Sequence, residues 1–277
     1  MFAALKKLFR DPRKELMGVL GDSPIPTFPA LTLRTLQALR DPSASMKKVA
    51  DLVTADPAVS VKVLSLVNSA AYGLRRPVNN VQHACTMLGR SKLEGVVLAV
   101  AVSQALPSHN TQGFVHRRFW NAAARRAATA KALADLLDPA SASVSFTAGL
   151  LQDLAVPMLA HQKKGYGPLL EQWVNDGGSL EALEHQEFGW DHATVAGWLC
   201  TDWSFPDDLG CSIAGHHGLH EAPAPVALVA HLGEGDEQGV DELIEVARER
   251  YSAHPDRIIH ALEKGAKHGL EVARLFA

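Results

Sequence analysis

The sequence predicts an all-α fold, and three observations point to it. Only 6% of the 277 residues are aromatic, and no run of alternating β-branched residues lasts beyond a few positions. Segments that open with an aspartate–proline pair and continue with apolar residues at steps of three and four recur along the chain. With 47% hydrophobic and 21% charged residues, the chain can bury a large core in one or two domains.

Charge, cysteine content and the length of apolar runs argue against several classes of protein. The formal net charge of −3 gives no global attraction to nucleic acid, so no nucleic-acid partner is expected. Cys85, Cys200 and Cys211 are odd in number and lack CxxC spacing, which favours reduced core thiols over disulfides or a thiolate zinc site. No apolar run reaches signal-peptide length or the roughly 18 residues of a membrane span, so a cytoplasmic protein without a transmembrane segment is expected.

The amino-terminal part, residues 1–21, is predicted to be an amphipathic extension. Apolar residues share one side of a short helix opposite basic ones; they are Phe2, Leu5, Leu8 and Phe9. Docking on the body is the favoured interpretation, with membrane or partner binding as the alternative. Asp11–Pro12 starts a second helical turn, and the prolines in residues 21–31 mark an extended lead-in. A helix follows over 31–39, and Asp41–Pro42 repeats the helix-start signal.

Residues 56–73 contain the clearest helix signal in the chain. Asp56 can cap the backbone N–H groups, and Pro57 suits the first helical position. The apolar positions that follow have the period of a half-buried helix; they are Val59, Val63, Leu64 and Val67. Burial of each side chain stabilises by roughly 1.5 to 3 kcal/mol, which outweighs the weak helix propensity of valine.

The polar residues after this helix allow two interpretations. In the first, Asn68 ends the helix and bonds neighbouring backbone before a turn at Gly73. In the second, Asn68, Ser69 and Tyr72 contact a ligand or a partner protein.

The middle of the chain continues as helices. A helix is predicted over 78–88, where Gly89 closes it, and an apolar central helix over 91–105. After a polar connector at 107–113, a long helix over 114–137 carries basic residues, which are Arg117, Arg118, Arg125, Arg126 and Lys131. A solvated face is the favoured interpretation of this basic helix, with a surface for phosphate or an acidic partner, centred on Arg118 and Arg125, as the alternative.

The second half contains the chemically informative residues. Asp153 interrupts an apolar helix predicted over 145–159, and a buried carboxylate is costly unless it is paired or binds a cation. Histidines gather in the segment 189–217, although a lone histidine on such a helix is more often a hydrogen-bonded core residue. Asp138–Pro139 is another helix start, residues 221–232 form a short helix, and helices over 241–251 and 255–276 close the chain.

Part of this pattern resembles a known family. The positions that carry the resemblance are Asp56, Pro57, Asn68, Ser69, Ala70, Tyr72 and Gly73, followed by Ala84, Leu88 and Gly89. They resemble the HDOD (HD-related output) domain, an all-helical bacterial signalling module and a non-catalytic relative of HD and HD-GYP phosphohydrolases. The resemblance implies an N-terminal helical bundle, residues 22–110, packed against a degenerate HD-like bundle, residues 111–232, with closing helices over 233–277.

The resemblance also implies a damaged metal site. Metal-dependent HD proteins use an early histidine, a histidine–aspartate doublet, later histidines and a last aspartate. The matching positions here are Ala122, Gln152, Asp153, His192, His216, His217 and His231. Ala122 offers no ligand, Gln152 is a weak donor, and His231 replaces the last aspartate. Asp153 with the four histidines remains a candidate vestigial metal site.

These departures favour a non-catalytic regulatory module over an enzyme. Such a module would bind a signalling protein partner or a nucleotide second messenger, and no cofactor is expected beyond a residual divalent metal. The alternative is a metal-dependent phosphohydrolase of the HD type that uses the remaining aspartate and histidines.

Overall fold

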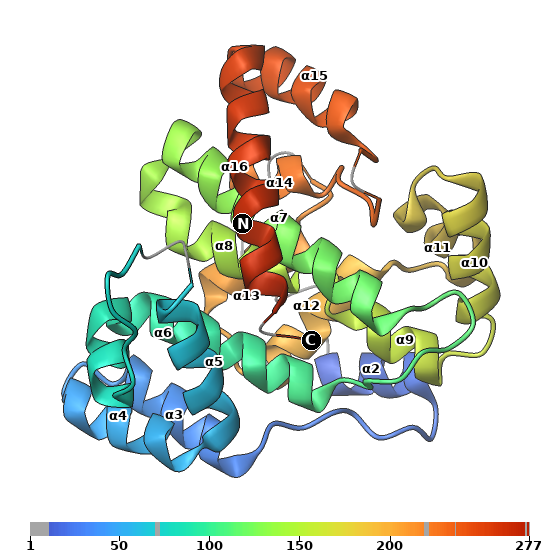
Figure 1. Cartoon of the computed structure of the whole chain (residues 1–277). Coiled ribbons are helices and arrows are strands. Elements are labelled where there is room, and N and C mark those ends of the chain that lie inside the picture. Colours follow the sequence, from blue (N-terminus) through green and yellow to red (C-terminus); the bar gives the residue numbers. More distant parts are fainter. Residues whose placement is uncertain (1–10, 70–72, 219–221, 236, 275, 277) are drawn as a thin grey trace.

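A computed structural model describes residues 11–69, 73–218, 222–235, 237–274 and 276, and over these residues the chain is helical without a β-strand. The all-α prediction is confirmed. The first helices are α2 (Pro12–Leu20), α3 (Ala30–Arg40), α4 (Met46–Ala55), α5 (Pro57–Val67) and α6 (Val81–Ala105). In Figure 1, α3, α4 and α5 gather against α6 at one end of the molecule.

Aspartate caps begin two of these helices as predicted. Asp11 accepts backbone N–H bonds at the start of α2, and Asp56 does so at the start of α5. The predicted helix start at Asp41–Pro42 was wrong. The Asp41 carboxylate instead accepts bonds from the backbone and hydroxyl of Ser43, which closes a local turn, and Ser45 caps α4.

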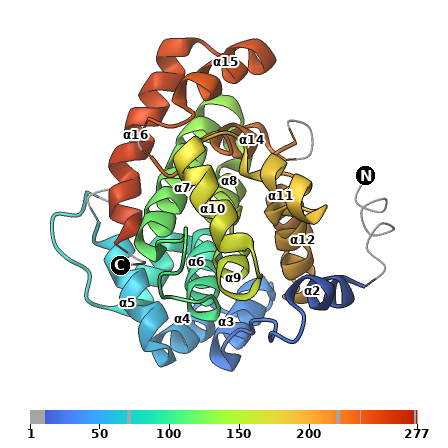
Figure 2. The same cartoon turned by 90° about the vertical axis from the view of Figure 1, so that its right-hand side faces the viewer.

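The amino-terminal helix docks on the second half of the chain. Leu16, Val19 and Leu20 of α2 are buried, and α2 lies beside α12 (His192–Asp202), as Figure 2 shows. The extended segment between α2 and α3 also contacts the second half of the chain, because the Trp203 Nε1–H donates to the Pro26 carbonyl at 2.8 Å. The predicted amphipathic helix within residues 1–10 lies outside the described residues.

Gly89 separates two helical parts of α6. Its φ of 71° and ψ of 169° break the helix, so the predicted end of the first part at Gly89 is confirmed. The first part begins at Val81, after an Asn80 cap, rather than at Val78. The kink places Arg90 at the end of α3, where its guanidinium donates to backbone carbonyls of residues 38, 39, 41 and 44.

The second half wraps around α7 (His116–Leu137). The elements that follow α7 are η2 (Pro139–Ser141), α8 (Ala142–Leu151), α9 (Ala155–Gln162), α10 (Tyr166–Asp176), α11 (Leu180–Phe188), α12, α13 (Asp207–Ala214) and α14 (Ala224–Val229). The continuous helix predicted over 145–159 was wrong. A turn at residues 152–154 separates α8 from α9 and carries Asp153.

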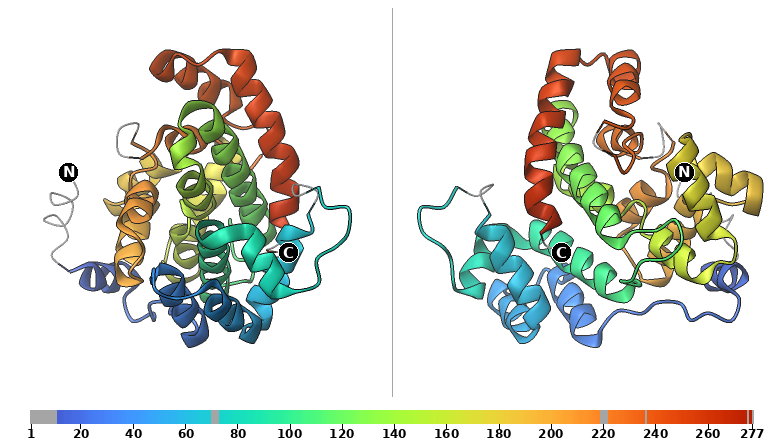
Figure 3. Two further views of the ribbon diagram at one scale, coloured as in Figure 1. Left: turned by 90° about the vertical axis from the view of Figure 1, so that its left-hand side faces the viewer. Right: turned by 45° about the vertical axis from the view of Figure 1, so that its right-hand side comes forward.

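Two further helices, α15 (Val240–Tyr251) and α16 (Pro255–Ala273), complete the described chain. Figure 3 shows α16 running along α7. The approach is close, since a Cβ on Gly265 would lie 2.6 Å from the Thr129 Cα and one on Gly269 would lie 2.8 Å from the Arg125 Cα. Glycine is therefore required at both contacts.

The stretch Pro139–Gln162 is apolar and long enough for a membrane span by composition, which differs from the expectation of none. Within the fold, 72% of its most apolar window is buried. The stretch comprises η2, α8 and α9, and α8 packs against α6, α7 and α13. The apolar side chains of this stretch therefore form part of the protein core.

Candidate functional site

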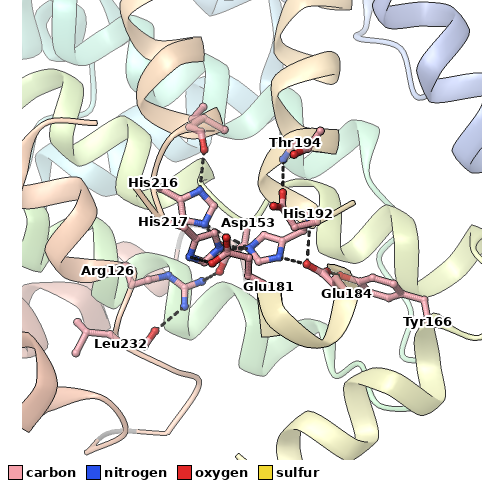
Figure 4. A network of polar contacts seen from close by, with 12 residues as sticks. Arg126, Asp153, Tyr166, Glu181, Glu184, His192, Thr194, His216, His217 and Leu232 are labelled. Atoms are coloured by element: carbon pink, nitrogen blue, oxygen red, sulfur yellow. Dashed lines mark hydrogen bonds and ion pairs between the residues drawn. The ribbon is translucent and has the colours of Figure 1, made fainter. Parts of the chain in front are cut away.

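Asp153 and three histidines meet between α7, α12 and α13, as Figure 4 shows. We call Asp153, His192, His216 and His217 the histidine–aspartate cluster. The His192 Nε2 lies 3.3 Å from the His216 Nε2 and 3.0 Å from the His217 Nε2. The Asp153 Oδ1 lies 3.5 Å from the His192 Nε2 and 3.4 Å from the His216 Nε2. The three histidines converge as predicted, and Asp153 lies beside two of them, His192 and His216.

Helix ends position each member of the cluster. His192 is the first residue of α12, which begins there because the Asp191 carboxylate accepts the Thr194 N–H at 2.6 Å. His216 and His217 follow the end of α13, and the His216 Nδ1–H donates to the Ile213 carbonyl at 2.7 Å. Asp153 lies in the turn between α8 and α9. Because these residues lie at helix ends and in a turn, their side chains can point toward one common centre.

Glu184 orients His192 from behind. Its fully buried carboxylate accepts the His192 backbone N–H at 2.8 Å and the His192 Nδ1–H at 2.6 Å. The other carboxylate oxygen accepts the Tyr166 hydroxyl. These bonds satisfy the buried charge and direct the His192 Nε2 into the cluster. The His216 Nε2 is directed there in the same way, by the bond from its Nδ1 to Ile213.

Arg126 pairs with the aspartate from the opposite side. The Arg126 side chain is 5% exposed, and its Nη2 donates to the Asp153 Oδ2 at 2.5 Å. Its Nη1 donates to the Leu232 carbonyl at 3.1 Å. The expectation of a solvated face is therefore wrong for Arg126, because this side of α7 faces the core.

The neighbouring arginines hold the segment that follows Leu232. The Arg125 Nη2 donates to the Gly233 carbonyl at 2.5 Å. The Arg118 Nη2 lies 3.2 Å from the Glu234 Oε2, and Arg118 remains half exposed. The residues proposed for an acidic partner thus contact an acidic segment of the same chain, and partner contact at Arg118 and Arg125 stays a prediction.

Burial opposes the charged form of each cluster residue, and charged neighbours outweigh burial at Asp153 and His192 but not at His216 and His217. Burial raises the pKa of Asp153, but Arg126 and His192 outweigh it and hold the pKa well below its ordinary value. Burial lowers the pKa of His192, but Glu184 and Asp153 raise it well above the ordinary value. Burial lowers the pKa of His216 to about 4 and also lowers that of His217. The surroundings thus favour the charged form of His192 and the neutral form of His216 and His217.

The donor set fits a divalent metal such as zinc. Imidazole nitrogens suit zinc, copper, iron and nickel. Zinc bonds of about 2.0 to 2.1 Å in a tetrahedron place neighbouring donors about 3.3 to 3.4 Å apart. Four of the six donor separations run from 3.0 to 3.5 Å, and the three histidines form the group in which all ligand atoms lie within 4.8 Å of one another. The Asp153 Oδ1 is buried and accepts no hydrogen bond within the described part of the chain, so it is free to bind a cation.

The other predicted site residues lie elsewhere. The His231 Nδ1 lies 3.2 Å from a Glu242 oxygen, and His231 is not part of the group of histidine nitrogens that approach one another within 4.8 Å. Ala122 is buried on α7, one turn before Arg126, and Gln152 is buried beside Asp153 with its Oε1 unbonded among the described residues. Ala122 has no donor atom to offer the cluster.

The second predicted group follows α5. The Asn68 Nδ2–H donates to the Val78 carbonyl at 2.8 Å, and its Oδ1 accepts the Val78 N–H at 2.7 Å. This is the predicted backbone contact. The Ser69 hydroxyl is buried without a hydrogen-bond partner in the described chain, and Tyr72 lies outside the described residues.

Sequence reasoning missed the roles of Arg126 and Glu184. Each is a charged residue at a position that the helical period assigns to the core. Arg126 is four residues after Ala122 and four before Ala130, and both alanines are buried. Glu184 is four residues after the buried Leu180 in α11. A charged residue at a helix position whose neighbours are apolar was the feature of the sequence that could have indicated these roles.

Comparisons with known proteins agree with this fold. The sequence model of the HDOD domain family matches residues 25–219. A Treponema pallidum (strain Nichols) protein described as uncharacterized is 25% identical over 206 residues, which are 72% of this chain and 39% of that protein. The chain therefore spans about two fifths of the length of this curated relative.

Two solved structures share the arrangement of helices. One is a candidate phosphohydrolase from Shewanella amazonensis, with a TM-score of 0.76, 21% identity, and coverage of 95% of this chain and 98% of that one. The other is a candidate signal transduction protein from Marinobacter aquaeolei, with a TM-score of 0.74, 18% identity, and coverage of 98% and 66%. At these identities the likeness concerns the fold alone.

Proposed function

Because the chain belongs to the HDOD domain family, we propose that it is a non-catalytic regulatory module that binds a signalling protein, and that its histidine–aspartate cluster holds one divalent metal as a structural centre. One observation carries the non-catalytic part. Three histidine nitrogens lie within 4.8 Å of one another, and the Asp153 Oδ1 lies 3.5 Å and 3.4 Å from two of them, so the number of nearby donors equals that of a closed zinc site. Metal-assisted hydrolysis needs an open position for an activated water.

The surrounding residues support a structural centre. Glu184 and the Ile213 carbonyl fix the Nδ1 atoms of His192 and His216, so their Nε2 atoms are held for a cation. The metal would supply a link between α12, the end of α13 and the turn before α9. His216 is fully buried and His192 nearly so, and the exposed part of the cluster is confined to the His217 side chain, 24% exposed, and the Asp153 side chain, 17% exposed.

The regulatory part draws on the family and on the Marinobacter protein of the same fold, which is described as a candidate signal transduction protein. In this proposal the metal holds the fold together, and the surface of the module binds the partner protein. The module would thus bind a protein partner and would not turn over a substrate.

A metal-dependent phosphohydrolase is the second candidate. The convergence of imidazole and carboxylate donors favours it, because the same ligand types activate water in hydrolytic sites. The Shewanella protein of the same fold is described as a candidate phosphohydrolase. The two candidates make opposite predictions about turnover.

The deciding experiment measures metal content and hydrolysis on one sample. The purified protein is loaded with zinc, manganese or iron, and bound metal is counted by mass spectrometry. Bis-p-nitrophenyl phosphate and p-nitrophenyl phosphate then report phosphodiesterase and phosphomonoesterase activity. The control is the double variant His192→Ala/His216→Ala, which removes two donors.

We expect about one metal per chain of the native protein, clearly less in the double variant, and the same background hydrolysis from both. Turnover by the metal-loaded native protein that disappears in Asp153→Ala would establish the phosphohydrolase instead. Equal metal uptake by the native protein and the double variant would show that the cluster is not a metal centre.

A further inference from the structure

Arg126 connects the histidine–aspartate cluster to the segment after α14. Its side chain is 5% exposed, and its two terminal nitrogens bond in different directions. Nη2 donates to the Asp153 Oδ2, and Nη1 donates to the Leu232 carbonyl. A guanidinium held at both nitrogens cannot turn away from Asp153 without losing a buried hydrogen bond.

The two oxygens of Asp153 therefore have separate partners. Oδ2 is used by Arg126, and Oδ1 faces the His192 Nε2 and the His216 Nε2. A carboxylate can bind a metal through one or both oxygens, or bridge two metals. The ion pair with Arg126 occupies one side of the second oxygen and so disfavours these uses. It also places a permanent positive charge beside Asp153, which repels a second cation.

Neighbouring contacts hold the same segment at other points. Leu232, which accepts the Nη1 bond, is 3% exposed. Arg125 holds the next carbonyl, that of Gly233, and Arg118 pairs with Glu234. Three arginines of α7 thus secure residues 232–234 over the Arg126 side of the cluster.

From these contacts we propose that Arg126 is a positioning residue that limits the cluster to one metal, bound by a single Asp153 oxygen and shielded from water on the α7 side. The inference rests on the proposed metal centre and explains why that centre is closed. Arg126 itself is not a ligand. It acts through the orientation of Asp153.

Cobalt(II) is the probe, because its visible absorption is intense in four-coordinate sites and several-fold weaker in five- or six-coordinate ones. The native protein, Arg126→Ala, Arg126→Lys and Arg125→Ala are each titrated with Co²⁺ alone and their spectra compared. Arg125→Ala is the matched control, since it loses a bond to the same segment, at Gly233, without touching Asp153. Circular dichroism and thermal unfolding verify that each variant is folded.

We expect intense absorption at one Co²⁺ per chain in the native protein and in Arg125→Ala. Arg126→Ala should lose several-fold in intensity as Asp153 is released and water enters. Arg126→Lys, which keeps the charge but cannot reach both partners, should lie between them and decides the question if Arg126→Ala fails to fold. Native-like spectra for the folded Arg126 variants would overturn the positioning role alone. Absence of Co²⁺ uptake by the native protein would overturn the metal centre as well.

Discussion

Asn68 closes the loop that follows α5 by bonding both backbone groups of Val78. The Asn68 side chain therefore joins the two ends of the loop that runs from residue 68 to residue 78. Because Asn68 is exposed, water can replace these bonds when the side chain is removed. The effect of losing it should be smaller than for a buried amide.

Asn68→Ala should lower the free energy of unfolding by about 1 kcal/mol, the usual net value for such hydrogen bonds. Urea denaturation measures the change. Ser65→Ala is the control, since Ser65 is exposed on the same helix and its side chain closes no loop in the described part of the chain. Equal midpoints for the two variants would contradict the loop-closing role and favour a contact role for Asn68.

The residues of the cluster were predictable to different degrees. Asp153 stood out because a carboxylate in an apolar helix needs a partner. The identity of that partner was not readable, because Arg126 lies 27 positions away and meets Asp153 only through packing of α7 and α8. His231 illustrates the converse, since the family pattern pointed to it and the structure pairs it with Glu242.

At the scale of helices, local signals succeeded where the backbone itself sets the boundary. Asp56 with Pro57 began a helix, and Gly89 ended one. Local signals failed where tertiary contacts determine the helix boundary. The break at residues 152–154 lies within an apolar run whose composition favours one continuous helix, and the same aspartate–proline signal made only a turn at Asp41.

Gly89 gives a direct test at this scale. Its φ of 71° with ψ of 169° is a conformation that only glycine adopts easily, and an added Cβ would meet nothing within 4 Å. Gly89→Ala should therefore cost about 1 to 3 kcal/mol of unfolding free energy through backbone strain alone. Chemical denaturation measures this cost.

Gly18→Ala is the matched control. Gly18 lies within α2, and a Cβ there also meets nothing within 4 Å. Alanine should stabilise the helix at this position by about 0.5 to 1 kcal/mol. If Gly89→Ala were as stable as Gly18→Ala, the two parts of α6 could join without strain, and the kink would not depend on glycine.

At the scale of the molecule, the halves share one apolar core. Buried residues from α2 to α14 form a single cluster, and a smaller one lies between α7, α14, α15 and α16. Composition and periodicity were sufficient to predict the helical class, because both report burial directly. The packing of α2 on α12 and of α16 on α7 was not predictable, because it depends on shape at contacts such as Gly265.

We propose that the core contains a closed metal centre without room for a catalytic water. X-ray absorption at the zinc edge of the zinc-loaded protein tests it most directly, because the signal reports the number and type of donor atoms. We predict four nitrogen and oxygen donors, three of them imidazoles, at about 2.0 to 2.1 Å. Five or six donors, including water, would contradict the claim.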